Sequence, residues 1–96
     1  MTGQELEAAF LNRGVIRGGI LFLRSDDAVA LIEAARGKNV RILGVDGFHL
    51  ASDFTQPLME HSLDVSSLDT VETWTAAINF IRQQTGNLFF EVVTGG

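Results

Sequence analysis

The chain has no cysteine, no tyrosine, a single proline and no long hydrophobic run. Without cysteine it can form neither a disulfide nor a thiolate metal site. No apolar stretch approaches the roughly 18 residues that a membrane-spanning helix needs. The first residues are acidic and lack the basic and apolar regions of a signal peptide. We therefore expect a cytoplasmic protein.

Positive charge is absent from the middle of the chain. No Lys or Arg occurs between Arg41 and Arg82, whereas six of the twelve acidic residues lie there. These six are Asp46, Asp53, Glu60, Asp64, Asp69 and Glu72. The net charge of −5 therefore originates in this segment. Because an acidic protein is repelled by nucleic acid and by anionic lipid, we expect neither as a partner and predict a basic protein instead.

Length and composition suit one domain that spans residues 1–96. Ninety-six residues are too few for two independent cores, and 46% of them are hydrophobic. Capping residues and periodicity predict a series of elements. They are a short helix after Thr2, a strand at 20–23, a helix at 25–36, a strand at 40–45, a helix capped by Ser67 or Thr70, and a strand at 88–93.

The succession of strand, helix and strand is typical of parallel βαβ units. We therefore predict an α/β fold, with α+β as the alternative, in which about three helices pack on a mostly parallel or mixed sheet of three to four strands. The expected order is α-β-α-β-(β)-α-β. Val71, Trp74, Ile78 and Ile81 fall on one helical face, which predicts that they are buried.

Between residues 46 and 66 the periodicity weakens, and we expect a loop with short extended pieces. Irregular segments on a rigid scaffold often carry binding residues, and interfaces favour aromatic anchors surrounded by charge. A solvated acidic loop without function is the alternative reading. The predicted partner-binding residues are Asp46, Phe48, His49, Asp53, Phe54, Glu60 and Asp64.

The sequence contains no recognised catalytic, metal-binding or phosphate-binding motif. His49, His61 and the nearby carboxylates have the right ligand types for zinc or manganese, but their spacing matches no metal motif. No serine lies in a nucleophile elbow, and Gly18-Gly19 precede their strand, where a phosphate-binding loop would follow it. We therefore expect no catalytic residue, metal or cofactor. A small metal-assisted hydrolase and a homo-oligomeric module that pairs through a strand edge remain alternatives.

Residues 41–48 (RILGVDGF) and 60–66 (EHSLDVS) resemble the small immunity proteins of bacterial polymorphic toxin systems. In one such family an alanine-rich helix precedes an Ile-Leu-Gly-Gly-like strand, a variable loop, and a polar and aromatic segment. Here Gly44-Val45 replaces the paired glycines, and there is no tryptophan around Ser62. The resemblance implies a bacterial, cytosolic, non-catalytic inhibitor that binds and blocks a toxin domain.

Overall fold

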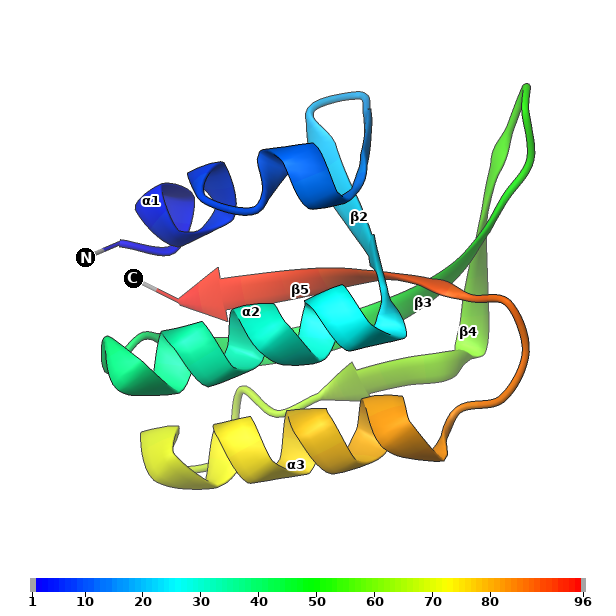
Figure 1. Cartoon of the computed structure of the whole chain (residues 1–96). Helices are drawn as coiled ribbons and strands as arrows, with labels where there is room; N and C mark the ends of the chain where they lie inside the picture. The colour runs from blue at the N-terminus through cyan, green and yellow to red at the C-terminus, as the bar shows by residue number, and fades with distance from the viewer. Residues whose placement is uncertain (1, 96) are drawn as a thin grey trace.

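The computed structural model describes residues 2–95 of the chain. Within that range the elements are α1 (Gly3–Ala8), a 3-10 helix η1 (Leu11–Arg13), β1 (Val15–Arg17), β2 (Ile20–Arg24), α2 (Ser25–Gly37), β3 (Arg41–Leu50), β4 (Thr55–Asp64), α3 (Thr70–Gln83) and β5 (Phe89–Gly95). The helices form one layer and the strands a second layer behind it (Figure 1).

The five strands form one sheet in the order β1-β2-β5-β3-β4, and every neighbouring pair is antiparallel. The fold is therefore α+β, and the prediction of an α/β fold with a mostly parallel or mixed sheet is wrong. Strands β2 and β3, which precede and follow α2, do run in the same direction, but β5 lies between them. In the same way β3 lies between β4 and β5, so neither helical crossover joins adjacent strands.

Two features of the strands also differ from what the sequence suggested. The three-residue strand β1 was not expected, because it is too short to show a periodicity; it pairs with β2 through a turn at Gly18 and Gly19, whose φ values are +57° and +79°. The segment expected as a loop is a long antiparallel hairpin, β3–β4, whose strands have ten residues each. Its outer strand β4 lies at the sheet edge, where Pro57 is tolerated.

The helices were predicted more successfully. The Thr2 hydroxyl oxygen accepts a hydrogen bond from the Glu5 backbone N–H at 3.2 Å, so the expected cap of α1 is present. Trp74 on α3 is buried, and its indole N–H donates to the Val40 carbonyl oxygen at 2.8 Å. Val71 is wrong as a core residue, because it is 71% exposed on the outer side of α3.

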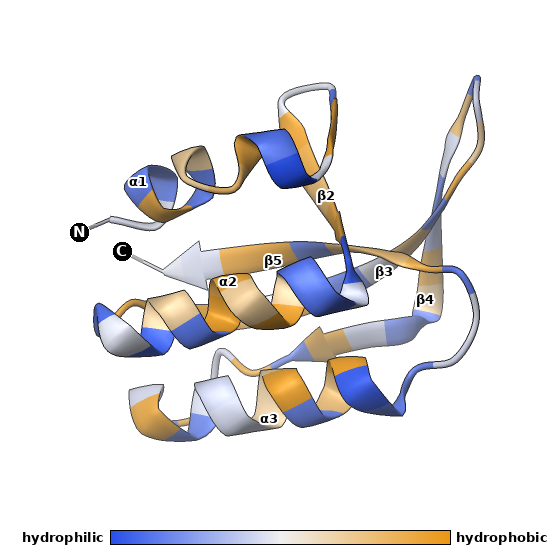
Figure 2. Cartoon of the chain, in the orientation of Figure 1, coloured by the Kyte–Doolittle hydropathy of each residue, from blue (hydrophilic) through white to orange (hydrophobic). Residues whose placement is uncertain are grey.

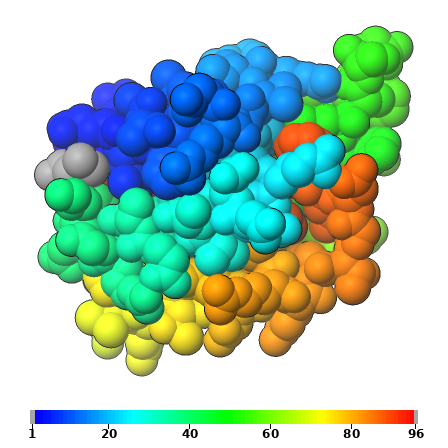
Figure 3. All heavy atoms as spheres, viewed as in Figure 1, coloured from blue at the N-terminus to red at the C-terminus, as the bar shows by residue number. Residues whose placement is uncertain are grey.

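One core lies between the helical layer and the sheet. Its largest fully buried members include Leu31 and Ile32 from α2, Ile81 from α3, and Ile42 and Phe90 from the sheet. Hydrophobic and hydrophilic residues alternate along α2 and α3, as expected for helices that bury one side (Figure 2). In the space-filling view the helices cover most of the near face, and the end of the β3–β4 hairpin projects beyond them (Figure 3).

The hairpin should require glycine at position 47, because a side chain there would meet His61. A Cβ added to Gly47 would lie 2.8 Å from both Cβ and O of His61, whereas one added to Gly37 at the end of α2 would have open space. We expect Gly47→Ala to lower the free energy of unfolding by about 1–3 kcal/mol, the usual cost of overpacking. Urea denaturation measures this, with Gly37→Ala as the control, which should be neutral or stabilising. Equal effects of the two variants would contradict the described packing.

Candidate functional site

All seven predicted partner-binding residues lie on the β3–β4 hairpin. Its turn is closed by a hydrogen bond from the Ala51 backbone N–H to the Phe54 carbonyl oxygen, at 2.9 Å. The Arg17 guanidinium, at the end of β1, donates to the same carbonyl at 2.9 Å and to the Thr55 hydroxyl at 3.3 Å. The tip of the hairpin is therefore tied to the β1–β2 hairpin at the opposite edge of the sheet.

The hairpin contains a wide bulge. Pairing passes from Asp46 opposite Ser62 directly to Gly47 opposite Leu58, so residues 59–61 of β4 have no paired residue on β3. Met59 in this bulge is 81% exposed, and Glu60 is also exposed. The third bulge residue, His61, turns toward the helices, where its Nδ1 lies 2.6 Å from Oε1 of Gln84.

The structure separates the predicted residues into three places. His49, Asp53 and Phe54 lie at the hairpin tip, where the His49 and Phe54 rings are 6.4 Å apart between centroids. Glu60 lies in the bulge. The other three, Asp46, Phe48 and Asp64, share the sheet face that points away from the helices. We call this surface the helix-free face.

Register defines the helix-free face. Val45 and Val92 are paired and buried under the helices, so their neighbours along each strand project to the opposite side. Residues directly opposite one another in paired strands share a face. The helix-free face therefore includes Gly44, Asp46 and Phe48 from β3, Ser62 and Asp64 from β4, and Phe89, Glu91 and Val93 from β5.

The end of this face nearest β2 is aromatic. The Phe48 ring packs edge-on against Phe22 with centroids 4.8 Å apart, and the Arg24 guanidinium lies over the Phe89 ring at 4.6 Å. Phe48 is half-buried in this contact, whereas Phe54 at the hairpin tip is 52% exposed. Of the two predicted aromatic anchors, Phe54 is therefore the more exposed to solvent.

The other end of the face is acidic, and sequence reasoning missed one of its members, Glu91. Asp46 stands directly opposite Glu91 in the β3–β5 ladder. Partial burial, the negative charge of Asp46 and that of Glu7 on α1 together raise the pKa of Glu91. Glu91 is the single acidic residue within the apolar run Phe89–Val93. Because a charged side chain in such a strand has to point away from the core, this pattern could have identified Glu91 from the sequence.

Asp64 behaves differently from Glu91. Its carboxylate accepts hydrogen bonds from the Ser66 hydroxyl at 2.6 Å and from the Ser66 backbone N–H at 2.9 Å. These bonds favour the charged form and lower the pKa of Asp64. The carboxylate is therefore held in place and stays ionised to lower pH than an ordinary aspartate.

No cation within residues 2–95 neutralises the acidic residues of the hairpin or Glu91. The ion pairs in this part of the chain join Arg13 to Asp27 and Arg36 to Glu33, both on the helical side. Arg41, which begins β3, instead donates to the backbone carbonyls of Ser66 and Leu68, the latter at 2.7 Å. The hairpin carboxylates therefore form no ion pair among the described residues, although the Arg17 guanidinium lies at the tip and Arg41 contacts Ser66 near Asp64.

The residues proposed for the metal-assisted alternative do not come together. His49 is at the hairpin tip, whereas His61 lies in the bulge and contacts Gln84. Among the described residues, no three His, Asp or Glu side chains are grouped so that they could hold a metal ion. The geometry therefore gives this alternative no support.

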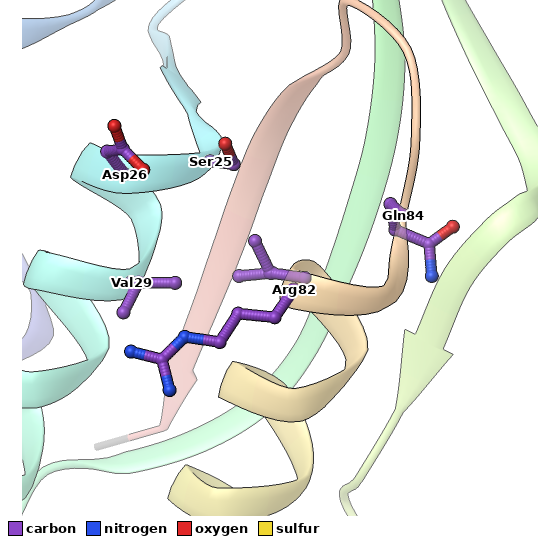
Figure 4. A pocket seen from close by; sticks show the side chains of 6 residues that line it. Ser25, Asp26, Val29, Arg82 and Gln84 are labelled. Carbon is purple, nitrogen blue, oxygen red and sulfur yellow. The ribbon is translucent and has the colours of Figure 1, made fainter.

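A cavity of about 440 Å³ lies on the helical side, between the start of α2 and the end of α3. The Arg82 side chain crosses it toward Val29, and Ser25, Asp26 and Gln84 also line it (Figure 4). The Asp26 carboxylate opposes an anion at the start of α2, where the helix dipole would otherwise attract one. None of the predicted partner-binding residues lines this cavity.

Neither a scan against models of protein families nor a search of curated proteins finds a match for the chain. Over residues 2–95, no helix combines the length and the apolar character needed to cross a bilayer.

The partial burial of Glu91, together with the negative charges of Asp46 and Glu7, should be visible as pH-dependent stability. Because the pKa of Glu91 is raised, the folded protein binds a proton here more readily than the unfolded chain. The charged carboxylate therefore lowers stability as pH rises from its ordinary pKa through the raised one. We expect Glu91→Gln to increase the free energy of unfolding at pH 7 by roughly 0.2–1 kcal/mol.

This gain should disappear below about pH 4, where the wild-type carboxyl is protonated in both states. Chemical denaturation across the pH range measures it. Glu60→Gln is the matched control, because Glu60 is exposed in the bulge. A gain for Glu91→Gln that is independent of pH, or that Glu60→Gln reproduces, would contradict a raised pKa at Glu91.

Proposed function

We propose that this protein is a non-catalytic binding protein that docks a basic protein partner through the β3–β4 hairpin and the acidic end of the helix-free face. The observation that carries the proposal is the unneutralised opposition of Asp46 and Glu91 in adjacent strands. Like charges directly opposite one another destabilise a sheet. A cationic group of a partner would remove that penalty, so the free protein is less stable than it would be in the complex.

The shape of the hairpin supports docking. Its end projects beyond the helical layer and carries Asp53 and the exposed ring of Phe54 (Figure 3). The hydrogen bonds from Arg17 hold this end in place before any partner arrives. A surface that is already ordered loses little conformational entropy on binding, which favours affinity.

The kind of partner follows from charge and from the resemblance to immunity proteins. We infer an immunity-type inhibitor that acts in the bacterial cytoplasm by covering a basic toxin domain. Nuclease toxins, which bind a polyanion, are basic, and an acidic inhibitor associates with a basic target at an accelerated rate. The exposed Asp53 and Glu60 would contribute to this attraction, with Phe54 as the apolar contact.

Removing the negative charges of Asp53 at the hairpin tip and Glu60 in the bulge tests this function. If a toxin-like protein is encoded beside the gene, the double variant Asp53→Asn, Glu60→Gln should slow association with it by on the order of tenfold at low salt. It should also weaken the dependence of the association rate on salt. Stopped-flow or surface-based kinetics with the two purified proteins measures both.

A charge-matched control is Glu33→Gln, Glu72→Gln, which removes two acidic residues from the helical layer. Equal slowing by the two double variants would show that only net charge matters and that the hairpin is not the docking surface. If no toxin-like protein is encoded beside the gene and none binds the purified chain, the inhibitor function is refuted.

A further inference from the structure

The helix-free face contains a hollow where a side chain is missing. Gly44 lies at the centre of three strands, opposite Asp64 on β4 and Val93 on β5. A Cβ added to Gly44 would lie 2.9 Å from the Leu63 carbonyl oxygen, so the backbone of β4 approaches Gly44 closely. Gly44 lines an open pocket of about 300 Å³, which we call the Gly44 pocket.

The pocket has apolar walls. Register shifts between Ile42 and Gly44 in the β3–β5 ladder, which leaves Leu43 unpaired with β5. Leu43 and Val93 both line the pocket. Such walls suit the aliphatic part of a long side chain, since burial of each methylene group contributes about 0.8 kcal/mol.

The rim of the pocket carries negative charge. Asp46 and Asp64 line it, and Ser66 holds the Asp64 carboxylate in its ionised form. Asp46 also faces Glu91 across the adjacent strand pair. The nearby Arg41 donates to two backbone carbonyls at the β4–α3 connection and forms no ion pair with either aspartate.

We propose that the Gly44 pocket receives an arginine side chain of the protein partner, with the aliphatic part against Leu43 and Val93 and the guanidinium between Asp46 and Asp64. This inference rests on the proposed function, because that function supplies a basic protein as the partner. Arginine fits better than lysine, since its planar guanidinium carries five N–H donors and can serve two carboxylates at once.

The test uses the full chain and three small probes: the N-acetyl methylamides of arginine, of lysine and of citrulline, which is the neutral analogue of arginine. Backbone amide shifts are followed by NMR as each probe is added. We expect arginine to cause saturable shifts centred on Gly44, Asp46 and Val93. Lysine should bind more weakly, and citrulline should cause no comparable change.

Asp46→Asn should weaken arginine binding by about tenfold, which corresponds to the loss of one charge-assisted hydrogen bond. This variant also removes the repulsion with Glu91, so it should fold at least as well as the wild type. Asp26→Asn, at the exposed start of α2 on the helical side, is the matched control and should leave arginine binding unchanged. Citrulline shifts equal to those of arginine, equal effects of the two variants, or no saturable shift at tens of millimolar probe would overturn the proposal.

Failure of the pocket can be distinguished from failure of the proposed function. If toxin association depends on Asp53 and Glu60, and Asp46→Asn weakens toxin binding but arginine does not bind in the pocket, the function stands and the pocket is refuted. If arginine binds in the pocket but no basic toxin associates with the chain, the pocket is a guanidinium site and the inhibitor function is refuted.

Discussion

The position of β5 is the constraint on which the rest of the structure depends, because it alone joins the two halves of the sheet. In the strand pairing, β5 lies between the β1–β2 hairpin and β3, and it is the last strand of the described chain. Its side chains alternate between the two faces: Phe90 and Val92 fill the core, whereas Glu91 and Val93 project to the helix-free face. One strand therefore completes the core and supplies part of the acidic surface.

The one-sided arrangement of the helices explains why the two sheet faces differ so strongly. The helices bury their apolar residues against a single face, so that face is mainly hydrophobic. The opposite face has to stabilise itself by contacts within the sheet. At the β2 end it does so through Phe22 and Phe48, whereas at the other end Asp46 and Glu91 oppose each other without a cation. The face therefore combines good local packing with a local electrostatic penalty, and natural proteins concentrate such local conflicts at functional or strained sites.

Sequence reasoning identified what depends on local signals and missed what depends on pairing. The cap at Thr2 and the periodicity that buries Trp74 are properties of single helices, and both were recovered. The order of strands could not be recovered, because a helix that links adjacent parallel strands and one that skips a strand require the same local patterns. The hairpin was hidden for a related reason: the unpaired residues 59–61 interrupt the alternation of β4, so its two halves do not read as one strand. The acidic segment was found from composition alone, but Glu91 joins it only through the register of β5.

The acidic residues divide into two groups that act at different distances. Charges at the hairpin tip and bulge are exposed, so they attract a basic protein over about one Debye length, roughly 8 Å at physiological ionic strength, and they are weakened by salt. Asp46 and Glu91 are half-buried on the sheet, and their effect on a partner requires contact. The first group would therefore govern how fast a complex forms, and the second how long it lasts, since rim charges act mainly on association rates and desolvated charges on dissociation rates. The hairpin connects the two groups through a single pair of strands, so a partner drawn to the tip would already be aligned with the acidic end of the sheet.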